Sequence, residues 1–237
     1  MTAGPKILAI ETSGQSGSVA LCAAGQIVAQ RQLDPQARSA RVLAPAMQEI
    51  LRHQGWQPRQ IDVVAVAVGP GSFTGLRVGV TTAKTFAYAV GAKVVAINTL
   101  DVIAAGVHDA PPQVQRLLVG LDAQRGDVFA AQYGRTGQQP WQRVALAEIM
   151  TSAAWLALAG EDCGLAGPVL TKLVGSNQGD VLSTNAWLAP REQWEPQATA
   201  VAQLAAERAV ANAFDDLWTL APLYLRRSAA EEKLLGE

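Results

Sequence analysis

The sequence predicts an α/β fold of two lobes with mixed sheets flanked by helices, and three observations support this prediction. Two short apolar strands separated by a polar turn open the chain, which is typical of an antiparallel hairpin. A Val-rich strand, a Gly-rich loop, a helix and a further strand follow, and this order defines a parallel βαβ unit. The hairpin pattern then returns after residue 113 of the 237. Repetition and length together favour two lobes over one large domain.

The first predicted elements are three strands of a meander. Residues 7–10 and 18–23 are apolar runs, separated by a polar turn that begins at Glu11. Residues 26–33 alternate loosely between apolar and polar side chains, and Pro35 then interrupts the pattern. The chain is therefore expected to start with antiparallel pairing.

A helix and a parallel unit are predicted next. Apolar residues occur in pairs four positions apart between residues 42 and 51, which places them on one helix face, with Pro45 in the first turn or at a kink. The unbroken apolar run 63–68 indicates a strand covered on both faces, near the centre of a parallel sheet. The Gly-rich loop then leads to a helix over 76–90 and another apolar strand at 93–97.

The second lobe is predicted from a repeated plan. Residues 8–21 and 118–131 each contain an apolar strand that ends in one carboxylate, a polar turn with glycine, and a second apolar strand. This repetition suggests a duplicated lobe, with chance similarity over a short stretch as the alternative. We therefore divide the chain into an N-terminal lobe, residues 1–108, and a smaller C-terminal lobe, residues 109–237.

The remainder of the second lobe has a weaker pattern. It predicts a helix over residues 147–158, a short strand around Leu165 and a loop over residues 177–196. An Ala-rich stretch predicts a long last helix over about 196–214, and one option is that this helix packs back on the first lobe.

Charge, cysteines and apolar runs exclude several classes of protein. The chain has 19 Lys and Arg residues against 20 Asp and Glu residues, so no net positive field attracts nucleic acid or anionic lipid. Cys22 and Cys163 lie in no CxxC or Cys/His pattern, which argues against disulfide and zinc frameworks. No apolar run approaches the ~20 residues of a membrane helix, and no secretion signal begins the chain. We therefore expect a cytoplasmic protein without membrane contact.

Four motifs carry a resemblance to a known family. Residues 69–79 read GPGSFTGLRVG, residues 7–13 read ILAIETS, residues 122–126 read DAQRG and residues 224–226 read YLR. Together they resemble the bacterial TsaB (YeaZ) family over essentially the whole chain. The resemblance implies an actin-like ATPase (ribonuclease H-like) fold. It also implies work beside a catalytic TsaD-like subunit and a TsaE-like ATPase, which install threonylcarbamoyl on the adenosine next to the anticodon of tRNA.

The resemblance also implies a surface for the partner, because in this family two helices meet the equivalent pair of another subunit. Here the helix 76–90 carries a stripe of small and apolar residues, and the helix 42–51 carries a second apolar face. A heterodimer with the TsaD-like subunit and a homodimer of the chain alone are expected to compete for this surface. Packing of part of the stripe on the protein's own sheet is the alternative. The expected dimer interface consists of Val42, Met47, Ile50, Leu51, Leu76, Gly79, Val80, Ala83 and Phe86.

The imidazoles of a TsaD-like enzyme are missing from this chain. A transferase of that kind holds its metal with two histidines four residues apart on one helix face. The only histidines are His53 and His108, and Thr99 and Ile103 stand where the resemblance places the metal-binding pair. We therefore expect a non-catalytic subunit without catalytic residues, metal or cofactor, which meets tRNA only indirectly through its complex.

A vestigial nucleotide site is the remaining candidate. In active actin-like ATPases the two hairpin turns cradle phosphate and hold magnesium through a carboxylate. The matching residues are Glu11, Thr12, Ser13 and Asp122, and Gly167 lies where an adenosine contact is expected. An active site of this kind would make the chain a nucleotide-dependent phosphotransferase or ATPase, and ordinary polar residues at strand ends are the other interpretation.

Three further kinds of site have little support. The Gly-rich loop matches neither of two phosphate-binding motifs. The motif GxGxxG needs glycine where Thr74 stands, and a P-loop needs Gly-Lys-Ser/Thr where Gly75-Leu76-Arg77 stands. No Ser/His/Asp set suggests a protease. The nearest approach to an RNA-binding patch is Tyr224 with Arg226 and Arg227, for which a solvated tail is the ordinary interpretation.

Overall fold

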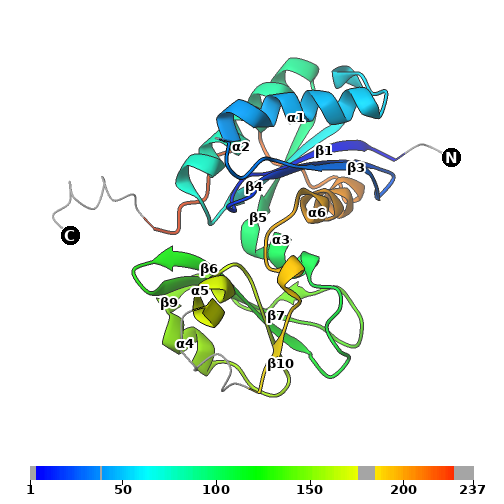
Figure 1. Ribbon diagram of the computed structural model, residues 1–237. Coiled ribbons are helices and arrows are strands. Elements are labelled where there is room, and N and C mark those ends of the chain that lie inside the picture. Colours follow the sequence, from blue (N-terminus) through cyan, green and yellow to red (C-terminus); the bar gives the residue numbers. More distant parts are fainter. Residues whose placement is uncertain (1–3, 38, 176–184, 227–237) are drawn as a thin grey trace.

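The computed structural model describes residues 4–37, 39–175 and 185–226, which form an upper and a lower lobe in Figure 1. The upper lobe is built on a five-stranded sheet with the order β3-β2-β1-β4-β5. β1 pairs antiparallel with β2 and parallel with β4, so the sheet is mixed, as predicted. Its strands are β1 (Lys6–Glu11), β2 (Ser18–Ala23), β3 (Gln26–Gln32), β4 (Val63–Gly69) and β5 (Lys93–Asn98).

Helices cover both faces of this sheet because its inner strands alternate between two apolar faces. Ile10 and Val66 face the cluster beneath α1 (Ser39–His53) and α2 (Phe73–Val90), which lie above the sheet in Figure 1. Ala9 and Ala65 face the opposite cluster, which α6 (Ala198–Val210) and α3 (Thr99–Gly106) complete. A 3-10 helix, η1 (Pro58–Gln60), precedes β4. The strands of this lobe are therefore buried on both sides.

The lower lobe repeats this plan with a six-stranded sheet of order β11-β10-β6-β7-β8, in which β9 also pairs with β7. β6 pairs antiparallel with β7 and parallel with β10, just as β1 pairs with β2 and β4. The repeated plan read from the sequence is thus confirmed in the topology. The strands are β6 (Arg116–Gln124), β7 (Asp127–Gly134), β8 (Gln142–Arg143), β9 (Glu148–Thr151), β10 (Cys163–Ala166) and β11 (Trp187–Leu188).

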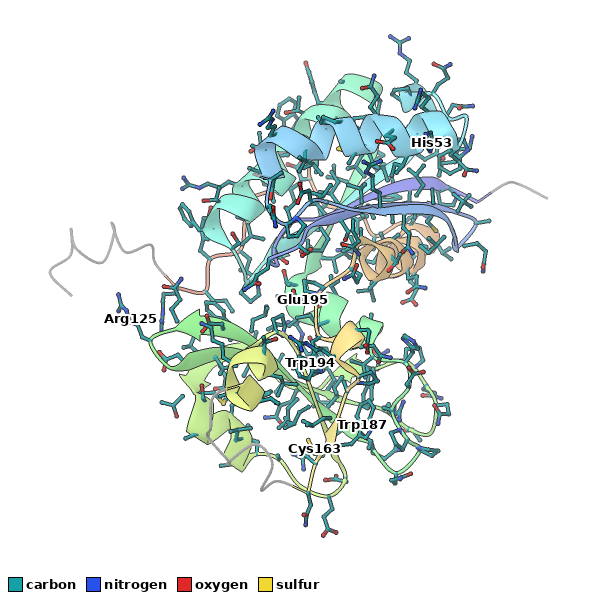
Figure 2. The ribbon with its side chains drawn as sticks, viewed as in Figure 1. His53, Arg125, Cys163, Trp187, Trp194 and Glu195 are labelled. Carbon is teal, nitrogen blue, oxygen red and sulfur yellow. The ribbon has the colours of Figure 1, made fainter. Side chains whose placement is uncertain are left out.

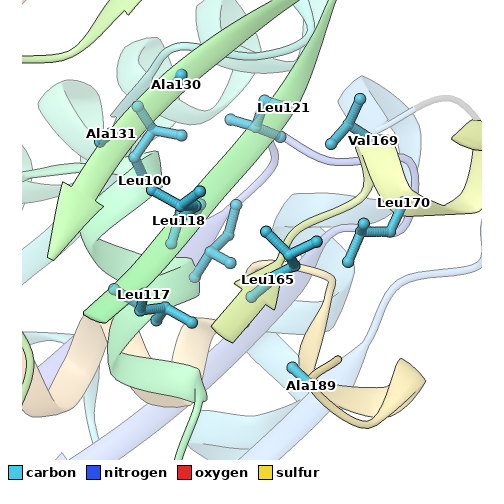
Figure 3. Packing of buried hydrophobic residues seen from close by; sticks show 14 of the residues in the cluster. Leu100, Leu117, Leu118, Leu121, Ala130, Ala131, Leu165, Val169, Leu170 and Ala189 are labelled. Atoms are coloured by element: carbon cyan, nitrogen blue, oxygen red, sulfur yellow. The ribbon is translucent and has the colours of Figure 1, made fainter. Parts of the chain in front are cut away.

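One apolar cluster fills the lower lobe. Leu118 and Leu165 come from the neighbouring strands β6 and β10, and Leu170 comes from α5 (Val169–Gly175). Figure 3 shows these side chains together with Leu100 of α3, which lies between the two sheets. α3 therefore contributes side chains to the cores of both lobes.

Two of the predicted elements in the lower lobe were wrong in part. The stretch expected to be one helix over residues 147–158 is the strand β9 followed by the short helix α4 (Ser152–Ala157). Ile149 and Met150 pair with Phe129 and Val128 of β7, so tertiary pairing replaces the first helical turn. The hydroxyl of Thr151 then accepts a hydrogen bond from the amide of residue 154 and caps α4.

The last helix is shorter than predicted, because α6 ends at Val210. Asn212 has a φ of 53°, and the amide of Ala213 bonds to the carbonyl of Arg208, which closes the helix. The predicted loop 177–196 contains β11 and the 3-10 helix η2 (Arg191–Gln193), and its residues 177–184 lie outside the described part.

The C-terminal part of the chain returns to the upper lobe. α6 packs against β1 and β2, and the amide of Ala198 donates to the hydroxyl of Ser18 at 2.8 Å. The following segment runs beside α2 and the end of β4, since Lys84 of α2 donates to the carbonyl of Leu220 at 2.9 Å and the amide of Leu223 donates to the carbonyl of Val68 at 2.7 Å. The boundary after residue 108 stays a prediction. Among the described residues, every helix is too short or too polar to cross a bilayer.

Candidate functional site

The turn after β1 begins with a fully buried carboxyl group. Glu11 has no exposed surface, and its Oε1 accepts hydrogen bonds from the amide and the hydroxyl of Ser13, the former at 2.5 Å. Its Oε2 has no hydrogen-bond partner among the described residues. Thr12 and Ser13 are buried as well. The residues predicted for a vestigial nucleotide site in this lobe are therefore all inside the protein.

The Gly-rich motif covers one side of this turn. The hydroxyl of Thr12 donates to the carbonyl of Gly75 at 2.8 Å, and the amide of Ser72 donates to the carbonyl of Ser13 at 2.8 Å. A Cβ atom on Gly75 would lie 2.0 Å from the carbonyl oxygen of Thr12, and one on Gly79 would lie 2.2 Å from its hydroxyl. The two glycines are required because the start of α2 contacts the turn directly.

The segment before α6 covers the other side of the turn. A Cβ atom on Gly14 would lie 3.0 Å from Oε2 of Glu195 and 3.3 Å from Cγ of Pro196. The Oε2 atom of Glu195 is buried and has no hydrogen-bond partner among the described residues. Figure 2 shows Glu195 between the two lobes. The sequence did not point to Glu195, because it lies far along the chain from Glu11 and belongs to no motif.

The two carboxyl groups lie in an environment that disfavours negative charge. Burial raises the pKa of Glu11 to about 7, against the opposing hydrogen bonds from Ser13, and the charge of Glu195 raises it further. Burial also raises the pKa of Glu195. A phosphate group placed at this turn would therefore lie next to a buried pair of acids.

The second hairpin turn lies in the lower lobe and has its own partners. Asp122 forms an ion pair with Lys172 of α5, and its Oδ1 accepts from the amide of Gln124 at 3.1 Å. Gly167 has a φ of 117°, and a Cβ atom there would lie 2.1 Å from the carbonyl oxygen of Gly120. Gly167 thus lets the end of β10 approach β6 closely, which is a structural reason for the glycine.

The positions compared with a metal-binding histidine pair are part of the core. Thr99 and Ile103 of α3 are both fully buried. His53 lies at the end of α1, and His108 follows α3 with its Nε2 atom 3.6 Å from Asp109. Within the described residues, no group of three or more His, Cys, Asp or Glu side chains is arranged to hold a metal ion.

An open groove of 790 Å³ lies between α1 and α2 on the upper lobe. Met47 and Leu51 of α1 and Phe86 of α2 line it, and all three were predicted for the dimer interface. Its rim also contains exposed side chains that were not among the predicted interface residues. Three of them lie four residues apart along α2, which is a regular spacing that the sequence contains. These rim residues are Ala44, Gln48, Thr81, Thr85 and Ala89.

The rest of the predicted interface points into the protein's own core. Val42 is half-buried, and Ile50 of α1 is 5% exposed. The small-residue stripe of α2 packs on the β1 turn and on β4, as the contacts of Gly79 with Thr12 and Val66 illustrate. A partner can therefore reach the rim of the groove, whereas the stripe is covered. The covered members are Ile50, Leu76, Gly79, Val80 and Ala83.

Comparison with known proteins gives three concordant matches. A family model described as "TsaD: tRNA N6-adenosine threonylcarbamoyltransferase" matches residues 34–234. The tRNA threonylcarbamoyladenosine biosynthesis protein TsaB of Bacillus subtilis (strain 168) is 30% identical over 232 residues, which cover 96% of each chain. The tRNA N6-adenosine threonylcarbamoyltransferase of Desulfovibrio desulfuricans is 31% identical over 147 residues, 59% of this chain and 39% of the transferase.

A solved structure supports the fold. YeaZ from Pseudomonas aeruginosa superposes with a TM-score of 0.76 at 21% identity, and the match covers 93% of this chain and 100% of that one. At this level of identity the likeness concerns the fold alone. It agrees with the predicted class, an α/β fold with two mixed sheets flanked by helices.

Proposed function

Because the chain belongs to the TsaB (YeaZ) family, we propose that it is a non-catalytic subunit that binds a TsaD-like transferase and supports the formation of threonylcarbamoyladenosine in tRNA. The observation that carries this proposal is the groove between α1 and α2, which has an apolar floor and an open rim. A TsaE-like ATPase in a larger complex remains an expectation from the family, and work in the cytoplasm remains an expectation from the sequence.

The groove has the chemistry of a helix-docking surface. Its floor contains the apolar side chains of Met47, Leu51 and Phe86, and two of its rim residues, Thr85 and Ala89, are small. Small side chains allow a second pair of helices to approach closely, so that its apolar side chains can reach the floor. An exposed apolar surface of this kind is typical of a site at which a partner binds and covers it.

The proposed partner would present a related surface. The model of the transferase family matches residues 34–234, a range that contains both α1 and α2. Two related helix pairs can pack on each other around an approximate twofold axis. The same geometry permits a homodimer of this chain, so homodimer and heterodimer would compete for the groove.

The covered turn after β1 supports the non-catalytic part of the proposal. A nucleotide needs free backbone amides for its phosphates and a carboxylate that can hold magnesium. The contact of Thr12 with Gly75 and the approach of Glu195 to Gly14 cover part of this turn, and the raised pKa of Glu11 makes its carboxyl group a poor ligand for magnesium. A magnesium nucleotide therefore does not fit these residues.

We expect titration of the chain with ATP and magnesium to give no measurable heat, which corresponds to a dissociation constant weaker than ~1 mM. Isothermal titration calorimetry checks this at a protein concentration high enough to detect weak binding. Micromolar binding would contradict the non-catalytic proposal and favour the nucleotide-dependent phosphotransferase considered above.

A substitution on the rim of the groove tests the docking surface. Ala89→Arg is expected to weaken binding to the transferase at least about tenfold, because a long charged side chain would hold the second helix pair away. The change should leave the fold intact, since Ala89 is exposed. Leu51→Glu is a poorer test, because Leu51 is only 4% exposed and a carboxylate there would destabilise the subunit itself.

Affinity capture of the co-expressed transferase, followed by a binding titration, provides the measurement. The matched control is Ala153→Arg, which places the same side chain on an exposed alanine of α4 in the lower lobe. Equal binding by both variants would show that the partner docks elsewhere, and an unbound wild type would contradict the proposed function itself.

A further inference from the structure

The exposed aromatic side chains of this protein gather on one part of its surface. The chain has 4 Phe, 6 Trp and 3 Tyr residues, all within the described part. Those in the exposed class belong to the start and end of α2 and to the segment after α6. We call them the aromatic ridge; they are Phe73 (39% exposed), Tyr88 (67%), Trp218 (72%) and Tyr224 (42%).

The aromatic ridge consists of two pairs. The rings of Phe73 and Tyr224 are stacked with their centroids 4.9 Å apart, and those of Tyr88 and Trp218 meet edge to face at 5.6 Å. Phe73 is the first residue of α2 and Tyr88 lies near its end, so the two pairs are separated by about 22 Å along the helix axis. Each pair joins α2 to the C-terminal segment.

Cations lie next to both pairs and fix their positions. The guanidinium of Arg77 lies 4.0 Å from the centroid of the Phe73 ring, and its Nε donates to the hydroxyl of Tyr224 at 3.0 Å. The ammonium of Lys84 donates to the carbonyl of Trp218 at 3.0 Å and to that of Leu220 at 2.9 Å. The side chains of the ridge are therefore held in place before any ligand binds.

Two arginines lie where the ridge approaches the lower lobe, and one of them is paired with an aspartate. Arg226 donates to the carbonyl of Ala123 at 2.5 Å and pairs with Asp127 at 2.5 Å, beside the exposed Arg125 at the tip of the β6–β7 turn. Asp216 is an acidic residue near Trp218, and its carboxylate accepts a hydrogen bond from the amide of Trp218 at 2.9 Å.

We propose that the aromatic ridge contacts a single-stranded segment of RNA directly. Exposed rings provide platforms on which unpaired bases stack, and neighbouring Arg and Lys side chains attract the phosphate backbone. Aromatic and Arg side chains are also common at protein interfaces, whereas Lys is depleted there, so Lys84 beside the second pair is the feature that favours RNA over a protein partner. The inference rests on the proposed function for its choice of RNA, an anticodon loop, whose bases are unpaired.

The ridge also continues from the docking groove. Tyr88 lies on the same exposed side of α2 as Thr85 and Ala89 of the groove rim. A transferase bound at the groove would thus have the ridge at its edge, and RNA on the ridge would pass close to the contact between the two proteins. In this arrangement the chain itself contacts RNA, whereas in an indirect role only the transferase would contact it.

Fluorescence anisotropy with a labelled anticodon stem-loop RNA at low salt tests the proposal on the purified chain. The double variant Tyr88→Ala with Trp218→Ala is expected to bind this RNA at least about tenfold more weakly than the wild type, since two stacking platforms are removed. Binding should also weaken with added salt. Trp218→Ala alone, at a highly exposed position, gives a second variant in which the fold is least affected.

The matched control is the double variant Val144→Ala with Leu146→Ala, which removes two exposed apolar side chains, 66% and 87% exposed, from the lower lobe. It should bind the RNA like the wild type. Unchanged RNA affinity in both ridge variants, or no RNA binding by the wild type, would overturn the proposal.

Capture of the transferase, measured in parallel, separates this proposal from the proposed function. Loss of transferase binding with unchanged RNA affinity would make the ridge a protein contact and overturn the inference, while the subunit role stands. A wild type that binds RNA through the ridge but no transferase would contradict only the proposed function.

Discussion

Replacing Gly75 by alanine is expected to lower the free energy of unfolding by about 3 kcal/mol. The added Cβ would lie 2.0 Å from the carbonyl oxygen of Thr12, and this neighbour is backbone in a buried turn, so it cannot rotate away. α2 would have to move from the β1 turn and lose the hydrogen bond between Thr12 and Gly75. Chemical denaturation, followed by circular dichroism, measures the change.

Two further substitutions make this test specific. At Gly79 the added Cβ would meet the hydroxyl of Thr12 at 2.2 Å, with the Cβ of Thr12 next at 3.5 Å. Thr12→Ala should therefore reduce the loss of stability that Gly79→Ala causes, but not the loss that Gly75→Ala causes. A double-mutant cycle measures this difference. Gly106→Ala is the control, because nothing lies within 4 Å of its Cβ position, and it should change the free energy of unfolding by less than about 1 kcal/mol. Equal relief at both glycines would contradict the packing described here.

Periodicity predicted most of the upper lobe because its strands and helices are long and regularly patterned. The run at β4 is apolar at every position and buried on both faces, as its sequence suggested. β9 has only four residues, and its pairing with β7 overrides a sequence that also suits a helix. Short elements held by distant partners leave little local signal, so the second lobe was less predictable than the first.

The residues of the candidate site were harder to predict for a different reason. The stripe on α2 showed that one helix face is buried, but a pattern does not say which surface buries it. The structure packs Gly79 and Ala83 on the protein's own core, and leaves Thr85 and Ala89 at the groove. Glu195 was missed because its relation to Glu11 exists only in three dimensions. Sequence reasoning therefore identified the helices that line the groove more readily than the side chains exposed on it.

The buried carboxyl group of Glu11 should make stability depend on pH. Its pKa is about 7 in the folded state against 4.5 for the free side chain, and burial is the main cause. Between these values the folded protein holds a proton that the unfolded chain releases, so the free energy of unfolding falls as the pH rises. Below about pH 4.5 the buried carboxyl group has no effect on the free energy of unfolding. Above about pH 7 it lowers that free energy by a constant amount of about 3 kcal/mol.

Glu11→Gln should remove this contribution, because an uncharged amide keeps an acceptor for Ser13 and has no proton to release. Urea denaturation of both proteins at a series of pH values from 5 to 8 should give a falling curve for the wild type and a flatter one for the variant. Glu148→Gln, at an exposed position on β9, is the control and should keep the slope of the wild type. Glu195→Gln should flatten the curve in part, because it removes a second buried carboxyl and the repulsion that Glu11 experiences. A wild-type curve that rises over this range, or one that Glu11→Gln leaves unchanged, would contradict a raised pKa for Glu11 in the folded protein.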